Sequence, residues 1–121
     1  MLKVFAYRNL HRNCWSVKAL EGRLKGRVIY YAQDLTLWNC VFKVSEAGRQ
    51  RVLREQKKNV HAGIVGVLDE STVNWVPSIP GKSVTYNPYK YASFVYKDTG
   101  EKALPVRFVR LAADKQVTSY A

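Results

Sequence analysis

The most distinctive chemistry in this sequence is a run of basic residues between positions 49 and 58. Arg51, Arg54 and Lys58 follow the three- and four-residue spacing that places side chains on one strip of an α-helix. Arg49 and Lys57 flank that strip. An arginine can hold a phosphate with two parallel hydrogen bonds, and a lysine adds a point charge. The run predicts phosphate contacts, although a solvated helix face is the ordinary interpretation of such a run.

A second group of basic residues is expected in loops that border the first strands. We expect this group to extend the same positive surface. Gly22 and Gly26 would let backbone N–H groups approach a phosphate there, although the same glycines fit an ordinary hairpin turn. The members of the group are Arg8, His11, Arg12, Arg23, Lys25 and Arg27.

A third group is aromatic and lies in the second half of the chain, where Lys82, Lys90 and Lys97 accompany it. Aromatic side chains beside lysines can stack on bases while the lysines meet phosphates. The alternative is that alternate tyrosines form a β-core and a partner surface, with lysine stems covering them. The candidate base contacts are Trp75, Tyr86, Tyr89 and Tyr91.

No convergent catalytic set is visible. Nearly all nine carboxylates fall in expected turns or at helix ends, and no hydrolase, phosphate-loop, zinc-protease or dinucleotide motif is present. A nuclease would need two or three carboxylates around a metal. Asp34, Glu46 and Asp69 could converge in space, but their spacing gives no support. We therefore expect a protein that is not an enzyme, with a small nuclease as an open alternative.

The two cysteines, Cys14 and Cys40, lie in apolar, strand-like runs and are expected to be reduced core thiols. Together with His11 and His61 they could formally complete a zinc site, but the pairs lack the spacing of zinc ligands. The sequence predicts neither a metal nor another cofactor.

These candidates depend on a series of short strands and one helix. Alternating or apolar runs predict strands at 4–7, 14–20, 27–32, 35–44, 60–68, 83–87 and 116–121 and a hairpin of 91–97 with 102–111. The strand at 35–44 is expected at the centre of the sheet, covered on both faces. Pro105 predicts an edge position for the second hairpin arm. A helix is expected at 45–58, with Ser45 as its N-cap and lysines at its end.

Together these elements predict an α+β fold, a mainly antiparallel sheet with one basic α-helix packed across it, in a single domain over residues 1–121. The net charge of +11 is unevenly distributed. Residues 1–68 carry a balance of +9, whereas residues 69–121 form a near-neutral, aromatic, β-rich half at +2. Such self-repulsion opposes folding, so a polyanionic partner is the simplest explanation.

The chain has no apolar run long enough to cross a bilayer and no secretory signal, so we expect no membrane partner and a cytoplasmic location.

Four segments of the first half, 7–17, 26–29, 44–54 and 59–62, resemble small accessory proteins of tailed phages. The resemblance covers about the first 65 residues and carries over no catalytic or binding residue. It implies a phage origin and a place in the cytoplasm of an infected host. Small phage proteins of this size often act on host machinery, and inhibitors of host defence are a frequent class.

The resulting hypothesis is a non-enzymatic, basic, phage-type protein that binds nucleic acid or a host nucleoprotein. Two further alternatives stay open. One is a protein–protein inhibitor whose basic face docks on a host enzyme, and the other is a pocket protein that sequesters a phosphorylated nucleotide signal. The sequence does not distinguish DNA from RNA, and it leaves the oligomeric state open.

Overall fold

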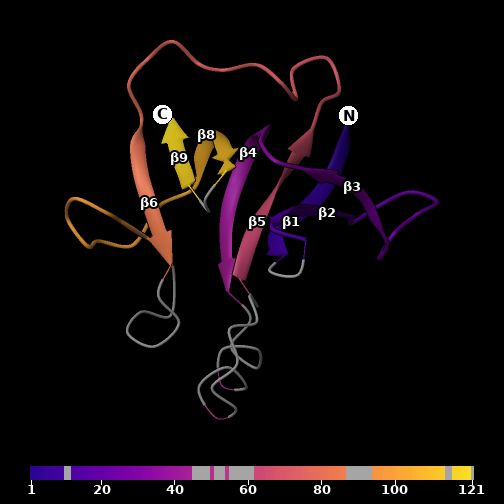
Figure 1. The fold of residues 1–121 in the computed structure, drawn as a ribbon, viewed down its shortest axis with the longest axis horizontal. Coiled ribbons are helices and arrows are strands. Elements are labelled where there is room, and N and C mark those ends of the chain that lie inside the picture. Colours follow the sequence, from indigo (N-terminus) through magenta and orange to yellow (C-terminus); the bar gives the residue numbers. More distant parts are fainter. Residues whose placement is uncertain are drawn as a thin grey trace.

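The computed structural model of the protein describes residues 1–9, 12–44, 50, 54, 62–86, 94–113 and 116–120. Nine strands in this part join into one antiparallel sheet in the order β3-β2-β1-β5-β4-β8-β9-β6-β7 (Figure 1). The strands are β1 (Leu2–Asn9), β2 (Cys14–Ala19), β3 (Val28–Ala32), β4 (Leu35–Val44), β5 (Ala62–Leu68), β6 (Lys82–Tyr86), β7 (Phe94–Tyr96), β8 (Val106–Ala112) and β9 (Gln116–Tyr120).

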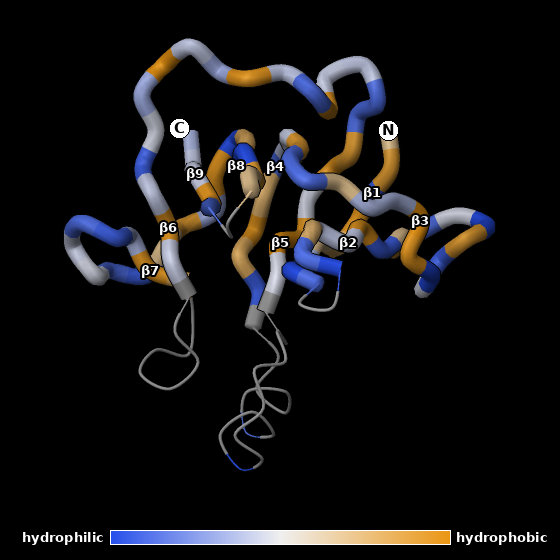
Figure 2. Tube along the Cα trace, in the orientation of Figure 1, coloured by the Kyte–Doolittle hydropathy of each residue, from blue (hydrophilic) through white to orange (hydrophobic). Residues whose placement is uncertain are grey.

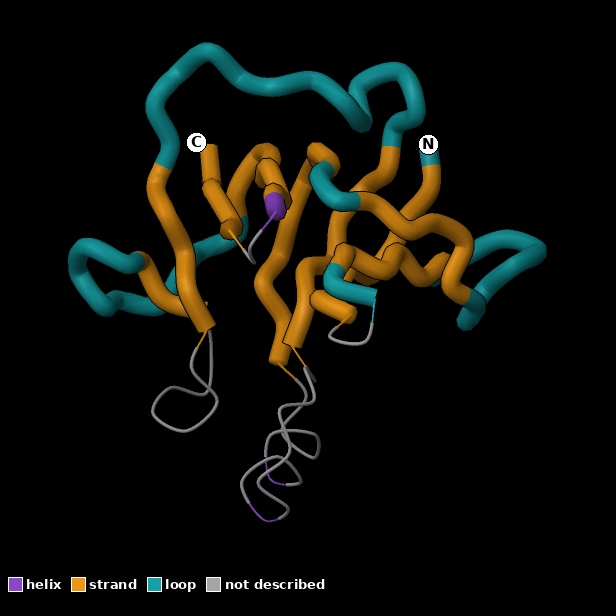
Figure 3. The backbone as a smooth tube through the Cα atoms, in the orientation of Figure 1, coloured by secondary structure: helices purple, strands orange, loops and turns teal. Residues whose placement is uncertain are grey.

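The expected α+β fold is wrong, because the described part is almost entirely antiparallel sheet and no described helix packs across it (Figure 3). The topology gives the physical reason. β4 and β5 are direct antiparallel neighbours, so the segment between them begins and ends at the same end of the sheet and is not a crossover. Of the helix expected at 45–58, Gln50 and Arg54 are described, and both are helical and exposed. The rest of that segment lies outside the described residues.

The expectation of a central strand at 35–44 is confirmed, since β4 is the fifth strand of nine in the sheet order. Leu35, Leu37 and Cys40 are fully buried on its core side, and Thr36 is fully buried on the opposite side. The change from odd to even positions occurs at Asn39, which adopts a left-handed φ of 50° where the register of β4 against β5 shifts. This β-bulge turns the side-chain alternation of the strand over.

The hairpin expected from 91–97 and 102–111 is only local. The backbone N–H of Tyr96 donates to the carbonyl of Glu101 at 2.8 Å, but β7 pairs with β6, and β8 lies between β4 and β9. The edge position predicted from Pro105 is therefore wrong. Proline lacks a backbone N–H donor, but Pro105 is the residue immediately before β8, so it removes no hydrogen bond from the ladder.

The sheet curls so that strands far apart in its order meet across the core. Trp15 on β2 donates from its indole Nε1 to the carbonyl of Ala112 on β8 at 2.8 Å. The rings of Phe42 on β4 and Phe94 on β7 lie 5.1 Å apart. Apolar stretches follow the strands, while hydrophilic residues gather in the connections (Figure 2). The basic and the near-neutral halves of the sequence thus share one sheet and one core.

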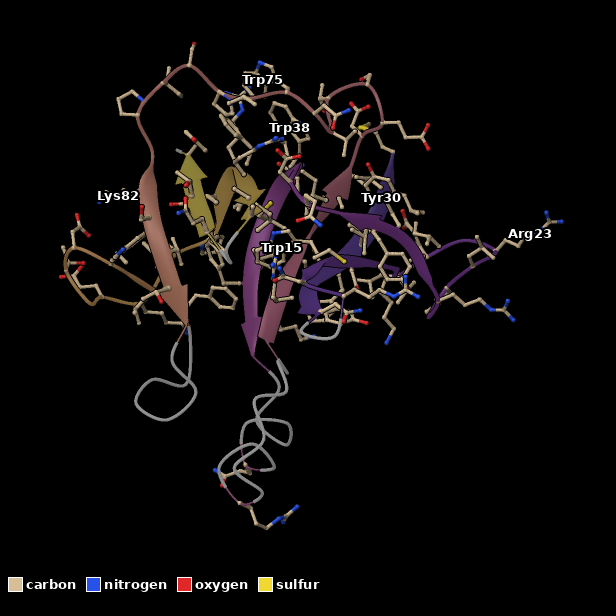
Figure 4. All side chains as sticks on the ribbon, viewed as in Figure 1. Trp15, Arg23, Tyr30, Trp38, Trp75 and Lys82 are labelled. Carbon is tan, nitrogen blue, oxygen red and sulfur yellow. The ribbon has the colours of Figure 1, made fainter. Side chains whose placement is uncertain are left out.

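Residues 69–81, here called the strap, connect β5 to β6 over the top of the molecule in Figure 1. The strap begins with a turn in which one Asp69 carboxylate oxygen accepts hydrogen bonds from the backbone N–H and the hydroxyl of Ser71. These bonds hold the pKa of Asp69 below its usual value. Farther along, Trp75 stacks on Trp38 with ring centroids 5.7 Å apart (Figure 4). The Phe108 ring lies 5.3 Å from that of Trp75 and is tilted against it by 52°.

Arg110 fastens the strap to the sheet from below. Its guanidinium pairs with Asp34 at 2.9 Å and donates to the hydroxyl of Thr36 and to the strap carbonyls of Val73 and Trp75. This is the one ion pair between residues that the structure describes. Arg110 therefore serves the fold, and its charge is not available to a partner.

Candidate nucleic-acid interface

The face of β1 that points away from the core carries aromatic and basic side chains in alternation. Val4, Ala6 and Arg8 are buried, so the odd positions of β1 lie on the opposite, outer face. Phe5 and Tyr7 are partly exposed there, and their rings stack with centroids 6.0 Å apart. Gly63 on β5 leaves room for the Phe5 ring, because a Cβ at position 63 would come within 2.6 Å of that ring.

The strand register extends this face from β1 to β2 and β3. Tyr7 lies opposite Ser16, and Ser16 lies opposite Tyr31, so these three residues form one row across three strands. Ser16 has no exposed surface, whereas Tyr31 is 46% exposed at the edge of the sheet. The guanidinium of Arg12 lies 4.4 Å from the centroid of the Tyr31 ring, within the range of a cation–π contact.

Basic residues surround these rings. Lys3 precedes Phe5 on the same face of β1, and Lys18 lies opposite Phe5 on β2. On the far side of β5, Lys43 lies opposite Gly63. We call the surface formed by these side chains the aromatic face. Its residues are Phe5, Tyr7 and Tyr31 with Lys3, Arg12, Lys18 and Lys43.

No Asp or Glu lies in any of the nine described strands. The carboxylates that the structure describes all lie in turns or in the strap, and Asp34 is already paired with Arg110. The basic residues of the aromatic face have no described ion-pair partner. This face therefore carries positive charge beside exposed aromatic rings, with nothing in the described strands to neutralise it.

A shallow hollow of about 450 Å³ adjoins the aromatic face where β1, β5 and β4 lie side by side. Its walls combine apolar side chains with three polar ones, Lys3, Glu21 and Asn39. The Glu21 carboxylate accepts a hydrogen bond from the backbone N–H of Lys3 at 2.9 Å. Within the part of the chain that the structure describes, the side-chain amide of Asn39 has no hydrogen-bond partner.

The basic residues predicted near the N-terminus do not gather at one point. Lys25 and Arg27 are exposed in the turn between β2 and β3, from which Arg23 extends away from the sheet (Figure 4). Arg12 lies at the other end of β3, beside Tyr31. The two groups thus mark the two ends of edge strand β3. The N–H of Gly26 donates to the carbonyl of Ala19, so the glycine turn uses this donor for its own hairpin.

Arg8 was expected in a loop, but it lies in β1 with its side chain on the core side, where it is 5% exposed. Its Nη2 donates to the side-chain oxygen of Asn13 at 2.6 Å, and the guanidinium lies 5.4 Å from the centroid of a Trp15 ring. The other two nitrogens, Nε and Nη1, are buried without a hydrogen-bond partner among the described residues. Arg8 therefore does not extend the exposed positive surface.

Of the five basic residues of the predicted helix strip, the structure describes one. Arg54 is described and exposed, while Arg49, Arg51, Lys57 and Lys58 lie outside the described residues. The predicted aromatic contacts are separated as well. Trp75 is 44% exposed on the strap, and Tyr86 ends β6. Tyr89 and Tyr91 lie outside the described residues.

Both cysteines are free thiols buried in the core. Burial raises the pKa of the Cys40 thiol to about 12. His11 and His61 lie outside the described residues, and among the residues that are described no three His, Cys, Asp or Glu side chains gather as metal ligands would. No helix within the described ranges is long and apolar enough to span a membrane.

Comparison with known proteins places the chain. The profile of the Mycobacterium phage L5 gene 82 protein family matches residues 1–119. The chain belongs to this family. The Gene 82 protein of Mycobacterium phage L5 is 42% identical over 105 residues, which cover 81% of this chain and 80% of that protein. No solved structure matches the chain. The resemblance to phage accessory proteins is thus confirmed, and it extends well beyond the first 65 residues.

Membership of the gene 82 protein family brings no assigned activity, so a function has to come from the residues of this chain. Apart from Arg12, the residues of the aromatic face were not predicted, because they do not form a cluster in the sequence. Its signal is the alternation of Lys3, Phe5 and Tyr7 within one strand, together with the absence of carboxylates from all the strand segments. The contribution of Tyr31 depends on a pairing between strands that the local sequence does not encode.

Proposed function

We propose that the protein binds single-stranded nucleic acid on the aromatic face. One observation supports this proposal above all. Three partly exposed aromatic rings share one face of a sheet with four Lys and Arg side chains, and no described strand contains a carboxylate. Bases stack on Phe5, Tyr7 and Tyr31, while the basic side chains contact phosphates.

A single strand suits this surface better than a duplex. The bases of a duplex are stacked on one another, and the grooves admit a helix or a narrow ribbon rather than the broad face of a sheet. Unpaired bases can instead splay out and lie on aromatic rings. Stacking of this kind tolerates many sequences, because every base has a π-face.

The basic side chains set how the affinity depends on salt. Four cations, Lys3, Arg12, Lys18 and Lys43, adjoin the rings. If each neutralises one phosphate, the slope of log K against log salt for a single strand is about −3, since each phosphate contributes about −0.7. Inside an infected cell, such a protein would block a host nucleoprotein by competing for its nucleic acid, or recruit it by binding the same strand.

The proposal is tested by fluorescence anisotropy with labelled single-stranded and double-stranded DNA and RNA at several salt concentrations. We expect Tyr31→Ala to weaken single-strand binding by about 1–3 kcal/mol, the typical contribution of one stacked base. Tyr30→Ala is the matched control. Tyr30 is the neighbouring residue of β3, is 37% exposed, and lies on the opposite face because it pairs with Val17.

Two results would overturn the proposal. One is the absence of binding to every oligonucleotide at low salt, where phosphate contacts are strongest. The other is an equal loss of affinity in the Tyr30 and Tyr31 variants, because the aromatic face would then have no special part in binding. A Lys18→Ala variant adds a quantitative check, since it should reduce the salt slope by about 0.7.

A second candidate, docking on a host protein, is favoured by the strap. Trp75, Val76 and Ile79 are 44%, 64% and 52% exposed, a concentration of apolar surface that is typical of protein interfaces. Apolar docking is far less sensitive to salt than phosphate binding. Retention of a host protein by the wild-type chain in about 0.5 M salt after nuclease treatment, and its loss with Ile79→Ser, would favour this candidate.

A further inference from the structure

The hollow beside the aromatic face lies where an adjacent nucleotide would fall. Lys3 belongs both to the aromatic face and to the lining of the hollow. The floor is apolar and comes from β5, where Val65 and Val67 are partly exposed on the same outer face as Phe5. Its volume of about 450 Å³ falls within the range typical of small-molecule sites.

Resting on the proposed function, we infer that this hollow takes one unstacked base and that Asn39 selects adenine there. An asparagine amide carries a donor and an acceptor side by side, which matches N7 and the N6 amine of adenine. Guanine presents two acceptors, N7 and O6, at the corresponding edge. With guanine in the hollow, the side-chain oxygen of Asn39 would face one of these two acceptors. The Glu21 carboxylate on the same wall is a further acceptor.

The backbone conformation at Asn39 is consistent with a binding role for its side chain. Asn39 adopts a φ of 50°, in the left-handed region that asparagine tolerates better than most residues other than glycine. It is also the extra residue of the bulge in the central strand, and bulges commonly re-aim a side chain beside a functional site. The amide that lines the hollow has no hydrogen-bond partner among the described residues, so its donor and acceptor are free for a ligand.

A matched contrast comes from the other asparagine with a positive φ. Asn13 has a φ of 52°, but its side-chain oxygen accepts the hydrogen bond from Arg8. Its conformation and its amide are therefore explained within the protein. Asn39 has the same backbone conformation, but its exposed side chain makes no such hydrogen bond to another described residue.

The test uses the full chain and three 12-nucleotide DNA probes: oligothymidylate alone, the same strand with adenines at its centre, and the same strand with guanines there. We expect the wild-type protein to bind the adenine probe at least fivefold more tightly than the guanine probe. Asn39→Gly should abolish this preference and leave binding to oligothymidylate and its salt dependence unchanged. Glycine suits the positive φ, so this variant keeps the bulge.

Asn39→Asp is the second variant, because it keeps the shape of the side chain and removes the donor. It should lose the adenine preference as well. Asn74→Gly, an exposed position on the strap, is the control and should bind like the wild type. An adenine preference that survives in Asn39→Gly, or a wild type without any preference, would overturn the hollow as a base site while the aromatic face stands. Absence of binding to all three probes and to RNA strands of the same sequences would overturn both proposals.

Discussion

Two of the arginines that the structure describes, Arg8 and Arg110, are buried, and their surroundings differ sharply. Arg110 reaches a carboxylate, a hydroxyl and two carbonyls, so most of its guanidinium donors are satisfied. Arg8 makes one hydrogen bond, and its guanidinium lies over the Trp15 ring. Two of its buried nitrogens have no partner among the described residues. Because an unpaired buried polar group costs stability, the net contribution of Arg110 to stability should exceed that of Arg8.

We predict that Arg110→Met lowers the free energy of unfolding by about 2–4 kcal/mol. The substitution keeps much of the volume but leaves Asp34 without its ion pair. It also removes the Arg110 donor from the carbonyls of Val73 and Trp75, which then accept only from the backbone N–H and the hydroxyl of Thr36. Urea denaturation measures the loss. Arg107→Met, at an exposed position of the same strand, is the control and should stay within about 0.5 kcal/mol of the wild type. Equal effects of the two substitutions would mean that the network does not hold the strap.

Cys40 gives the clearest dependence on pH. Its pKa is raised from 9.0 to about 12, so between these values the unfolded chain loses the thiol proton while the folded protein keeps it. Stability from this group is therefore complete below pH 9 and declines as the pH rises. We predict that the stability difference between the wild type and Cys40→Ala shrinks by about 1 kcal/mol from pH 9 to pH 10, measured by urea denaturation. A constant difference would contradict a buried, neutral thiol.

At the scale of elements, most strands could be predicted because their signal is local. The alternation in 14–20 and the apolar run in 35–44 correspond to β2 and β4. Pairing could not be predicted in the same way, since β8 joins a strand some seventy residues earlier in the chain. The prediction of a helix packed across the sheet was wrong for the same reason. Its periodicity was a local property, whereas the direct pairing of β4 with β5 is not.

The strap depends on close contact at its last residue, Gly81. A Cβ there would lie 2.6 Å from the methyl carbon of Thr118 and 2.8 Å from the carbonyl oxygen of Ser119, and the backbone cannot easily yield. We predict that Gly81→Ala lowers the free energy of unfolding by about 1–3 kcal/mol, as overpacking typically does. Ser78→Ala, at an exposed position of the same strap, should change it by less than about 0.5 kcal/mol. Equal stability of both variants in urea would show that the strap end adapts without cost.

For the whole molecule, the uneven charge of the sequence has a different meaning once the strands are placed. Residues 1–68 were expected to present their charge through a helix and through loops that border the first strands. The described cations of the aromatic face come from β1, β2 and β4, and only Arg12, in the turn after β1, was among the predicted residues. Composition could predict that the molecule attracts anions, because net charge does not depend on folding. Composition could not predict on which face the basic side chains gather, because that depends on which strands are neighbours.

Salt should therefore act on this protein in two opposite directions. With a net charge of +11 and one described ion pair, the folded chain repels itself, and screening relieves that repulsion. We predict that raising NaCl from about 20 mM to about 500 mM increases the melting temperature by roughly 3–6 °C, which corresponds to about 1 kcal/mol. The same change weakens oligonucleotide binding, because counterions compete for the phosphates.

A variant separates the two effects. Replacing Lys97, Lys102 and Arg107, all exposed and outside the aromatic face, with Gln lowers the net charge by three. Its melting temperature should rise less with salt than that of the wild type, while its affinity for a single strand and the salt slope stay the same. A melting temperature that falls with salt would contradict this account, since it would mean that attractive charge pairs outweigh repulsion in the folded protein.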